Sequence, residues 1–198
     1  MKIIDGLKLE GWCVEISGCN RGDLPEFFKE MGYKIGAEIG VYTGLYSAAL
    51  CRAGLKIYSI DPWLAYPEYN ESRSNQAKME RNFQRAKSRL SNYDCTIIRK
   101  TSMEAVKDFK DGSLDFVYID GNHNFMHVTE DIWEWSKKVR KGGVVSGHDY
   151  RNDDRHAFYV DVKHVLDGYT KAAKIPKWFI LGKEREIDKD RSWFWFNP

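Results

Sequence analysis

The chain has 198 residues, of which 42% are hydrophobic and 30% are charged, and its formal net charge is +2 at pH 7. This length predicts a single domain over residues 1–198. The small charge argues against a dedicated nucleic-acid-binding domain, which usually carries a clustered basic face. No stretch approaches the roughly 20 apolar residues of a membrane-spanning helix. The N-terminal residues also lack the apolar run of a signal peptide, so we expect a cytoplasmic protein.

From residue 33 onward, short apolar runs alternate with longer amphipathic stretches. In the amphipathic stretches, apolar residues recur every three or four positions, as from Met79 through Phe83 to Leu90, which is the spacing of a helix face. Gly54 and the pair Gly142–Gly143 are predicted to end two of these helices. The predicted helices cover 23–32, 43–54, 75–91, 101–109, 125–139 and 158–169. The predicted strands cover 33–41, 55–63, 95–100, 114–120, 144–150, 177–182 and 191–198.

The alternation of strands and helices predicts an α/β fold with a mostly parallel, seven-stranded sheet. The predicted strands are apolar throughout, which is typical of a sheet that helices cover on both faces. The last two strands are joined by a polar turn, whereas a parallel crossover needs a dozen or more residues. We therefore expect 177–182 and 191–198 to form a C-terminal antiparallel strand pair.

Polar residues follow five of the predicted strands. In open parallel sheets, ligands bind beyond the carboxyl ends of the strands, at the point where the strand order reverses. We therefore expect these five segments to converge on one site. They are Gly40–Gly44, Asp61–Trp63, Thr101–Ser102, Asp120–His123 and His148–Tyr150.

The first of these segments lies in the stretch GAEIGVYTG, where glycine permits a tight turn and close approach of a ligand. Its G-x-x-x-G spacing differs from the G-x-G-x-x-G of dinucleotide folds, and by itself it also fits a plain strand–helix turn. Asp61 ends the next strand, about 20 residues on, where an acidic residue can accept the hydroxyls of a ribose. Trp63 could stack on the base or pack in the core, and the sequence favours neither.

Together these motifs resemble those of class I S-adenosylmethionine-dependent methyltransferases. They are similar, more narrowly, to the bacterial group whose fourth strand ends in Asp-Gly-x-His-x-Tyr/Phe. The resemblance implies a Rossmann-like fold, with residues 33–198 as the catalytic core. Residues 1–32 precede it and include a short predicted helix, and we expect this segment to lie as a lid over the ligand edge of the sheet. The stretches that carry it are Glu38–Gly44, Tyr58–Asp61, Tyr118–Phe125, Gly142–Gly143 and Gly147–Tyr150.

The resemblance implies that S-adenosylmethionine is the cofactor. Gly40 and its neighbours would lie near its methionine and ribose parts, and Asp61 would hold the ribose hydroxyls. Glu38 would support that loop or reach the amino group of the cofactor through water. Ser102 and Met103 would flank the adenine. The implied cofactor-binding residues are Glu38, Gly40, Tyr42, Thr43, Gly44, Ser47, Asp61, Trp63, Ser102, Met103 and Asp120.

The segments after the fourth and fifth core strands supply the candidates for catalysis. Histidine titrates near neutral pH, so His123 and His148 are candidate general bases, with Asp120 near the acceptor. Some relatives bind a divalent cation there, and the corresponding set here is Asp120, Asn122, His148 and Asp149. Of these, Asp120 and Asp149 would be the ligands of Mg²⁺ or Mn²⁺. Those relatives often have an acidic residue where His148 stands. Because hard cations prefer oxygen ligands, His148 argues against a Mg²⁺ site. His123 could also serve only to cap the helix that follows it, and Asp149 only to cap the following loop.

The sequence therefore favours an S-adenosylmethionine-dependent O-methyltransferase that acts on a small-molecule or glycan hydroxyl. The alternatives are another nucleotide-binding enzyme, such as a dehydrogenase, and a non-catalytic binding module that keeps the fold. We expect neither a membrane nor a nucleic acid as partner, and a homo-oligomer is compatible with the sequence. Residues 64–75 and 150–160 are predicted to select the acceptor. The remaining histidines, His127, His156 and His164, are predicted to be solvated.

Overall fold

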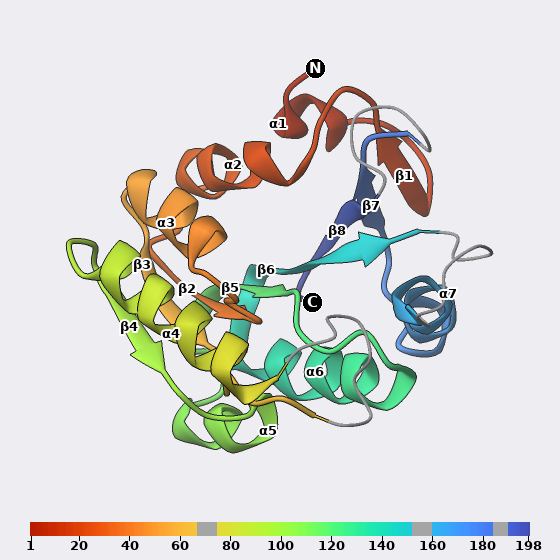
Figure 1. Cartoon of the computed structure of the whole chain (residues 1–198). Helices are drawn as coiled ribbons and strands as arrows, with labels where there is room; N and C mark the ends of the chain where they lie inside the picture. The colour runs from red at the N-terminus through yellow and green to blue at the C-terminus, as the bar shows by residue number, and fades with distance from the viewer. Residues whose placement is uncertain (67–74, 152–159, 184–189) are drawn as a thin grey trace.

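The computed structural model describes residues 1–66, 75–151, 160–183 and 190–198 (Figure 1). Within these ranges the strands are β1 (Cys13–Ile16), β2 (Ile35–Ile39), β3 (Lys56–Ile60), β4 (Cys95–Ile98), β5 (Leu114–Ile119), β6 (Val139–Tyr150), β7 (Trp178–Leu181) and β8 (Arg191–Phe196). The α-helices are α1 (Ile3–Gly6), α2 (Leu24–Glu30), α3 (Leu45–Arg52), α4 (Gln76–Leu90), α5 (Ser102–Ala105), α6 (Phe125–Lys138) and α7 (Val162–Ala172). The 3₁₀ helices are η1 (Arg21–Asp23) and η3 (Val106–Asp108).

In the described residues, the strands form one 8-stranded sheet with the order β1-β7-β8-β6-β5-β2-β3-β4. All neighbouring strands are parallel except β8, which is antiparallel to both β6 and β7. The prediction of a mostly parallel sheet with a C-terminal antiparallel pair is thus confirmed. The strand order reverses between β2 and β5, so their carboxyl ends mark the place where a ligand site is expected.

Strand β1 is an eighth strand, which the sequence did not predict. It has only four residues, its exposure alternates, and it pairs with β7 at the edge of the sheet, where Val14 lies opposite Phe179. A run this short gives little periodic signal. The N-terminal segment therefore extends the sheet as well as supplying helices.

Helix α2 covers a face of the sheet rather than its ligand edge (Figure 1). Phe28 stacks on Phe116 of β5, with ring centroids 4.1 Å apart, and Phe27 packs against Phe194 of β8 at 5.4 Å. Apolar contact with the sheet thus holds α2 away from the position predicted for a lid. Arg21, which lies in η1 just before α2, does reach the ligand edge.

The pair Gly142–Gly143 lies inside β6 and does not end the preceding helix. Helix α6 ends at Lys138, where the side-chain amide of Asn197 donates hydrogen bonds to the carbonyl oxygens of Ser136 (3.1 Å) and Val139 (2.8 Å). A Cβ at Gly143 would lie 2.4 Å from the carbonyl oxygen of Asp115. Glycine is therefore needed here for close approach of two chain segments.

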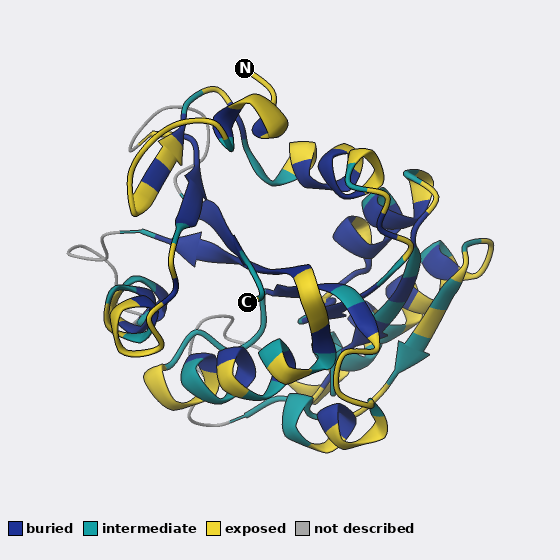
Figure 2. Ribbon diagram, turned by 180° about the vertical axis from the view of Figure 1, so that it is seen from behind, coloured by how far each residue is buried: buried dark blue, intermediate teal, exposed yellow. Residues whose placement is uncertain are grey.

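Helices cover both faces of the sheet, as predicted, and alternate strand residues feed two cores (Figure 2). Phe116 and Tyr118 of β5 face the core beneath α1, α2 and α3, whereas Val117 and Ile119 face the core beneath α5, α6 and α7. No helix in the described parts of the chain is long and apolar enough to cross a membrane.

Candidate active site

A cavity of about 720 Å³ opens beyond the carboxyl ends of β2, β3, β4 and β5. This volume falls within the range typical of ligand sites. Of the predicted site residues, those that line it are Glu38, Gly40, Tyr42, Thr43, Asp61, Ser102, Met103, Asp120 and His123. Those that do not line it are Gly44, Ser47, Trp63, His148 and Asp149.

The two glycines of the loop after β2 make room for other parts of the chain. Gly40 has φ +90°, and a Cβ there would lie 2.0 Å from the carbonyl oxygen of Asp120. Gly44 has φ +76°, and a Cβ there would lie 3.1 Å from Leu90 Cδ1 on α4. A side chain at either position would thus meet the protein itself, at β5 for Gly40 and at α4 for Gly44. The backbone of Gly40 still forms part of the cavity wall.

The carboxylate of Asp61 is held by backbone amides. It accepts hydrogen bonds from the N–H groups of Val41 (3.0 Å), Tyr42 (2.9 Å) and Trp63 (2.7 Å). Burial raises the pKa of Asp61, and these hydrogen bonds oppose that rise. Because a carboxylate offers about four acceptor positions, Asp61 retains capacity for a further donor from the cavity. It also fixes the loop after β2 against the end of β3.

Trp63 and Ser47 support this loop from the protein interior. Trp63 is 1% exposed, its ring centroid lies 4.9 Å from that of Phe83, and its Nε1 donates to the carbonyl oxygen of Tyr42 (2.8 Å). Packing in the core is thus the correct reading of Trp63, because its indole points away from the cavity. Ser47 is fully buried, and its hydroxyl donates to Glu38 and lies 2.6 Å from the hydroxyl of Ser59.

Glu38 lies at the base of the cavity, where it is almost completely buried. Burial raises its pKa to about 8, and the hydrogen bond from Ser47 only partly opposes that rise. The side chain is therefore protonated at neutral pH and can also donate a hydrogen bond.

Ser102 joins the tip of β4 to helix α6. The Nε1 of Trp135 donates to Ser102 Oγ (2.7 Å), which in turn donates to the carboxyl group of Asp131. Asp131 lines the cavity and was not singled out from the sequence, because it lies within a helix whose pattern gives no sign of a ligand site.

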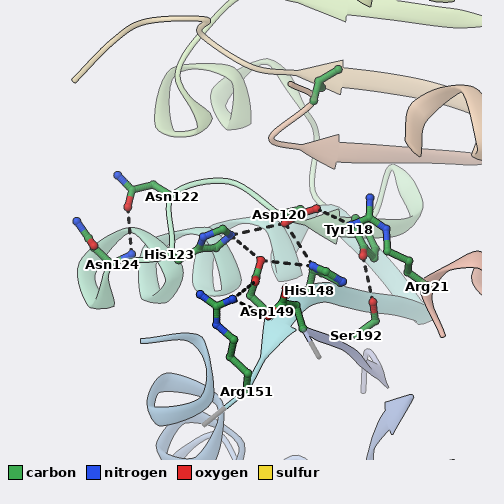
Figure 3. Close-up of polar contacts among 12 residues, drawn as sticks. Arg21, Tyr118, Asp120, Asn122, His123, Asn124, His148, Asp149, Arg151 and Ser192 are labelled. Carbon is green, nitrogen blue, oxygen red and sulfur yellow. Dashed lines mark hydrogen bonds and ion pairs between the residues drawn. The ribbon is translucent and has the colours of Figure 1, made fainter. Parts of the chain in front are cut away.

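Two aspartates and two histidines form a contiguous cluster after β5 and within the end of β6 (Figure 3). His123 Nε2 lies 3.0 Å from Asp149 Oδ2 and 3.6 Å from Asp120 Oδ1. His148 Nδ1 lies 3.4 Å from Asp149 Oδ2. Although burial opposes it, hydrogen bonds from the two histidines hold the pKa of Asp149 well below its usual range. The structure thus brings together the four residues predicted for catalysis and metal binding.

Arginines flank the cluster on both sides (Figure 3). Arg21 Nη1 lies 3.3 Å from Asp120 Oδ2, and its guanidinium carbon lies 4.6 Å from the ring centroid of Tyr46. Arg151 Nη1 lies 3.8 Å from Asp149 Oδ1. Sequence reasoning missed Arg21, because nothing in the N-terminal segment connects it to β5.

The remaining predicted histidines differ in their positions. His127 is exposed, as predicted, but it belongs to the wall of the cavity. His156 lies outside the described residues.

The cluster offers a donor set that suits a divalent cation. One ligand atom each from Asp120, His123 and Asp149 lie within 4.8 Å of one another. Carboxylates suit Mg²⁺ and Mn²⁺, whereas an imidazole suits the transition metals better. The set therefore fits Mn²⁺ better than Mg²⁺. The amide oxygen of Asn122 accepts the backbone N–H of Asn124 (3.0 Å) and so already has a partner.

Residues 35–150 match the sequence family described as "Methyltransferase domain". The chain belongs to this methyltransferase family. Its class I, S-adenosylmethionine-dependent fold agrees with the position of the cavity at the reversal of strand order.

Solved methyltransferases share the fold of this methyltransferase domain. An O-methyltransferase from Bacillus cereus in complex with SAH has a TM-score of 0.63 at 15% identity, and the match covers 89% of this chain and 80% of that enzyme. TomG from Streptomyces achromogenes, an O-methyltransferase in complex with SAM, has a TM-score of 0.62 at 15% identity, and the match covers 90% of this chain and 79% of TomG. The N-methyltransferase NodS from Bradyrhizobium japonicum has a TM-score of 0.58 at 14% identity, and the match covers 90% of this chain and 94% of NodS. At these identities the likeness establishes the fold alone.

One curated protein resembles part of this chain. The uncharacterized protein y4gI of Sinorhizobium fredii is 38% identical over 53 residues, which are 27% of this chain and 6% of that protein. The match thus spans a small fraction of the length of that relative.

Proposed function

We propose that this methyltransferase domain transfers a methyl group from S-adenosylmethionine to a hydroxyl group of a small molecule or glycan. The observation that carries the proposal is one cavity lined both by Asp61, which is held by backbone amides, and by Asp120 and His123, which contact each other. When bound, S-adenosylmethionine supplies a methyl group that is already activated by its sulfonium. The protein then has mainly to align the acceptor and accept its proton.

The residues around β2, β3 and β4 have the chemistry to hold the cofactor. Asp61 retains an acceptor position for a ribose hydroxyl, in line with its place at the end of the second core strand. The loop from Gly40 to Thr43 offers backbone groups to the methionine part, and protonated Glu38 lies beneath it. Ser102 and Met103 line the wall where the adenine is proposed to bind.

His123 is the best-placed proton acceptor for a hydroxyl group. It lines the cavity, whereas His148 lies behind it against Asp149. Asp149 contacts His123 Nε2 at 3.0 Å and would orient the ring and stabilise its protonated form. A positioned general base contributes about 10²- to 10⁴-fold to the rate.

A divalent cation could take over part of this role. Asp120 and Asp149 would hold it together with His123, and a cation there would lower the pKa of an acceptor hydroxyl. Mn²⁺ is the cation that this mixed donor set favours.

Calorimetry of the full chain with S-adenosylhomocysteine tests the proposal. Wild type should bind, and Asp61→Ala should weaken binding by about 10-fold or more, because it removes a carboxylate acceptor. Asp108→Ala is the matched control, since Asp108 pairs with Lys100 away from the cavity. No binding by wild type at millimolar ligand would end the proposal.

A further inference from the structure

Two cysteines lie together between helix α3 and the start of β4, and the proposed function gives neither of them a role. Cys51, in the last turn of α3, is buried, whereas Cys95, the first residue of β4, is half-buried. Cys51 Sγ lies 3.9 Å from the carbonyl oxygen of Asp94, the residue before Cys95. Both thiols are free, so a disulfide bond between them would be a new covalent link between the helix and the strand.

The surroundings of this pair favour one thiolate and one thiol. A hydrogen bond from Cys51 lowers the pKa of Cys95 to about 7; burial opposes this change and a hydrogen bond from Ser59 adds to it. The hydrogen bond to Cys95 and burial raise the pKa of Cys51, which therefore keeps its proton. The thiolate is the form of cysteine that peroxides oxidise, and redox-sensing cysteines often lie beside a second thiol that resolves the oxidised product.

The other two cysteines of the chain lie in different surroundings. Cys13 is exposed, yet the removal of its sulfur from water, together with the nearby Asp167, raises its pKa to about 11. Cys19 is buried, and its thiol donates to the carbonyl oxygen of Met1 at 3.0 Å. Cys95 is therefore the thiol of this chain that is best placed to react with an oxidant.

Cys95 is also the far end of a chain of hydrogen bonds that leads to the cavity. Its sulfur lies 3.1 Å from Ser59 Oγ, which in turn lies 2.6 Å from Ser47 Oγ. Ser47 donates to Glu38 at the base of the cavity. Because each hydroxyl group has a single hydrogen, Ser59 must donate to Ser47, and the thiol form of Cys95 can donate to Ser59. A disulfide sulfur carries no hydrogen, so oxidation of Cys95 would remove the first donor of this chain.

We propose that a peroxide joins Cys95 and Cys51 in a disulfide bond, and that this bond weakens the binding of the cofactor by disturbing the hydrogen bonds that hold Glu38. The disulfide site goes beyond the proposed function and does not depend on it. The effect on the cofactor does rest on the proposed function.

The oxidation takes place in two steps. The thiolate of Cys95 attacks one oxygen of hydrogen peroxide, the O–O bond breaks, hydroxide leaves, and Cys95 becomes a sulfenic acid. The sulfur of Cys51 then attacks the sulfur of Cys95, the S–O bond breaks, and the hydroxyl group leaves as water with the proton of Cys51. The two cysteines lose two electrons in total, and the peroxide is reduced to water.

Peptide mapping of the full chain after treatment with hydrogen peroxide tests the disulfide site. Wild type should give a pair of peptides joined through Cys51 and Cys95, which dithiothreitol separates. Cys51→Ala lacks the resolving thiol, so dimedone should trap its Cys95 as the sulfenic acid. Cys13→Ala is the matched control and should form the same disulfide as wild type. Absence of the joined peptides from oxidised wild type would overturn the inference.

Calorimetry with S-adenosylhomocysteine, after removal of the peroxide, tests the effect on the cavity. Oxidised wild type should bind at least about threefold more weakly than reduced wild type, and dithiothreitol should restore the affinity. Cys95→Ala should show no response to peroxide. A change of less than threefold in disulfide-bonded wild type would overturn the link to Glu38, as would an equal response in Cys95→Ala. Failure of reduced wild type to bind would instead overturn the proposed function, and the peptide map would still decide whether the disulfide forms.

Discussion

The β2–β3 end and the β5–β6 end of the site are built from different kinds of contact. At the β2–β3 end, the carboxylate of Asp61 is surrounded by backbone N–H groups, whose charge does not change with pH. At the β5–β6 end, Asp120, His123, His148 and Asp149 contact one another through titratable side chains. The first arrangement suits the holding of a ligand in one position. The second suits the movement of a proton, because histidine side chains can gain or lose a proton near neutral pH.

The largest effect is expected from a change that forces the two ends apart. Gly40→Ala places a methyl group 2.0 Å from the carbonyl oxygen of Asp120 at φ +90°, so the tip of β5 must move. We expect a loss of at least about 4 kcal/mol in the free energy of unfolding, measured by urea denaturation.

Gly54→Ala is the control for this change. Gly54 has φ +89°, but nothing lies within 4 Å of a Cβ there, so only the backbone strain of about 1 kcal/mol remains. Equal losses in the two variants would show that the contact between β2 and β5 is unimportant.

The next largest effect should fall on the β5–β6 end alone. His123→Ala should slow methyl transfer by about 10²- to 10⁴-fold while the affinity for S-adenosylhomocysteine stays within about threefold. The rate is measured as release of S-adenosylhomocysteine with a hydroxyl acceptor that wild type methylates. His127→Ala, on the same wall, should retain a rate near that of wild type. A His123→Ala enzyme of normal rate would remove His123 from the proposed mechanism.

The dependence of stability on pH tests the protonation of Glu38, which is buried beneath the cavity. The pKa of Glu38 is raised from 4.5 to about 8 in the folded state, so the folded protein holds this proton where the unfolded chain has lost it. Its contribution is therefore complete below pH 4.5 and declines as pH rises through 8. Between these limits, wild type should lose about 1 kcal/mol per pH unit relative to Glu38→Gln, which cannot titrate. Parallel stability curves for the two proteins, from urea denaturation at pH 5.5 and 7.5, would contradict this assignment.

The smallest effect is expected at Trp63. Trp63→Phe keeps an aromatic ring in the core but removes the hydrogen bond to Tyr42, at a cost of about 1 kcal/mol in unfolding free energy. Because the ring lies outside the cavity, the affinity for S-adenosylhomocysteine should stay within about threefold. Calorimetry that finds a 100-fold loss would restore the view that Trp63 stacks on the base.

The sequence predicted those features of the site that depend on local patterns in the chain. The carboxyl end of a strand can be located from apolar periodicity, so Asp61, Ser102, Asp120 and His123 were placed at the cavity correctly. Trp63 also follows a strand, yet its side chain enters the core, because the direction of a side chain after a turn depends on tertiary packing.

Arg21 and Asp131 show the opposite limit of sequence reasoning. Arg21 meets Asp120 across 99 positions of the chain, and Asp131 meets Ser102 across 29. Contacts between residues so far apart in the chain produce no recognisable spacing pattern in the sequence. The same holds for β1, whose partner β7 lies far along the chain.

The position of β8 in the sheet has a consequence for folding during synthesis. Residues 191–196 lie between β6 and β7, and Trp193 donates its indole N–H to the carbonyl oxygen of His148 at 2.9 Å. A growing polypeptide therefore leaves the ribosome with a gap in the middle of its sheet until these residues emerge. The edges of β6 and β7 stay open until then, and exposed strand edges invite pairing with other chains. The carbonyl oxygen of His148 can accept its hydrogen bond from Trp193 only after β8 has been synthesised.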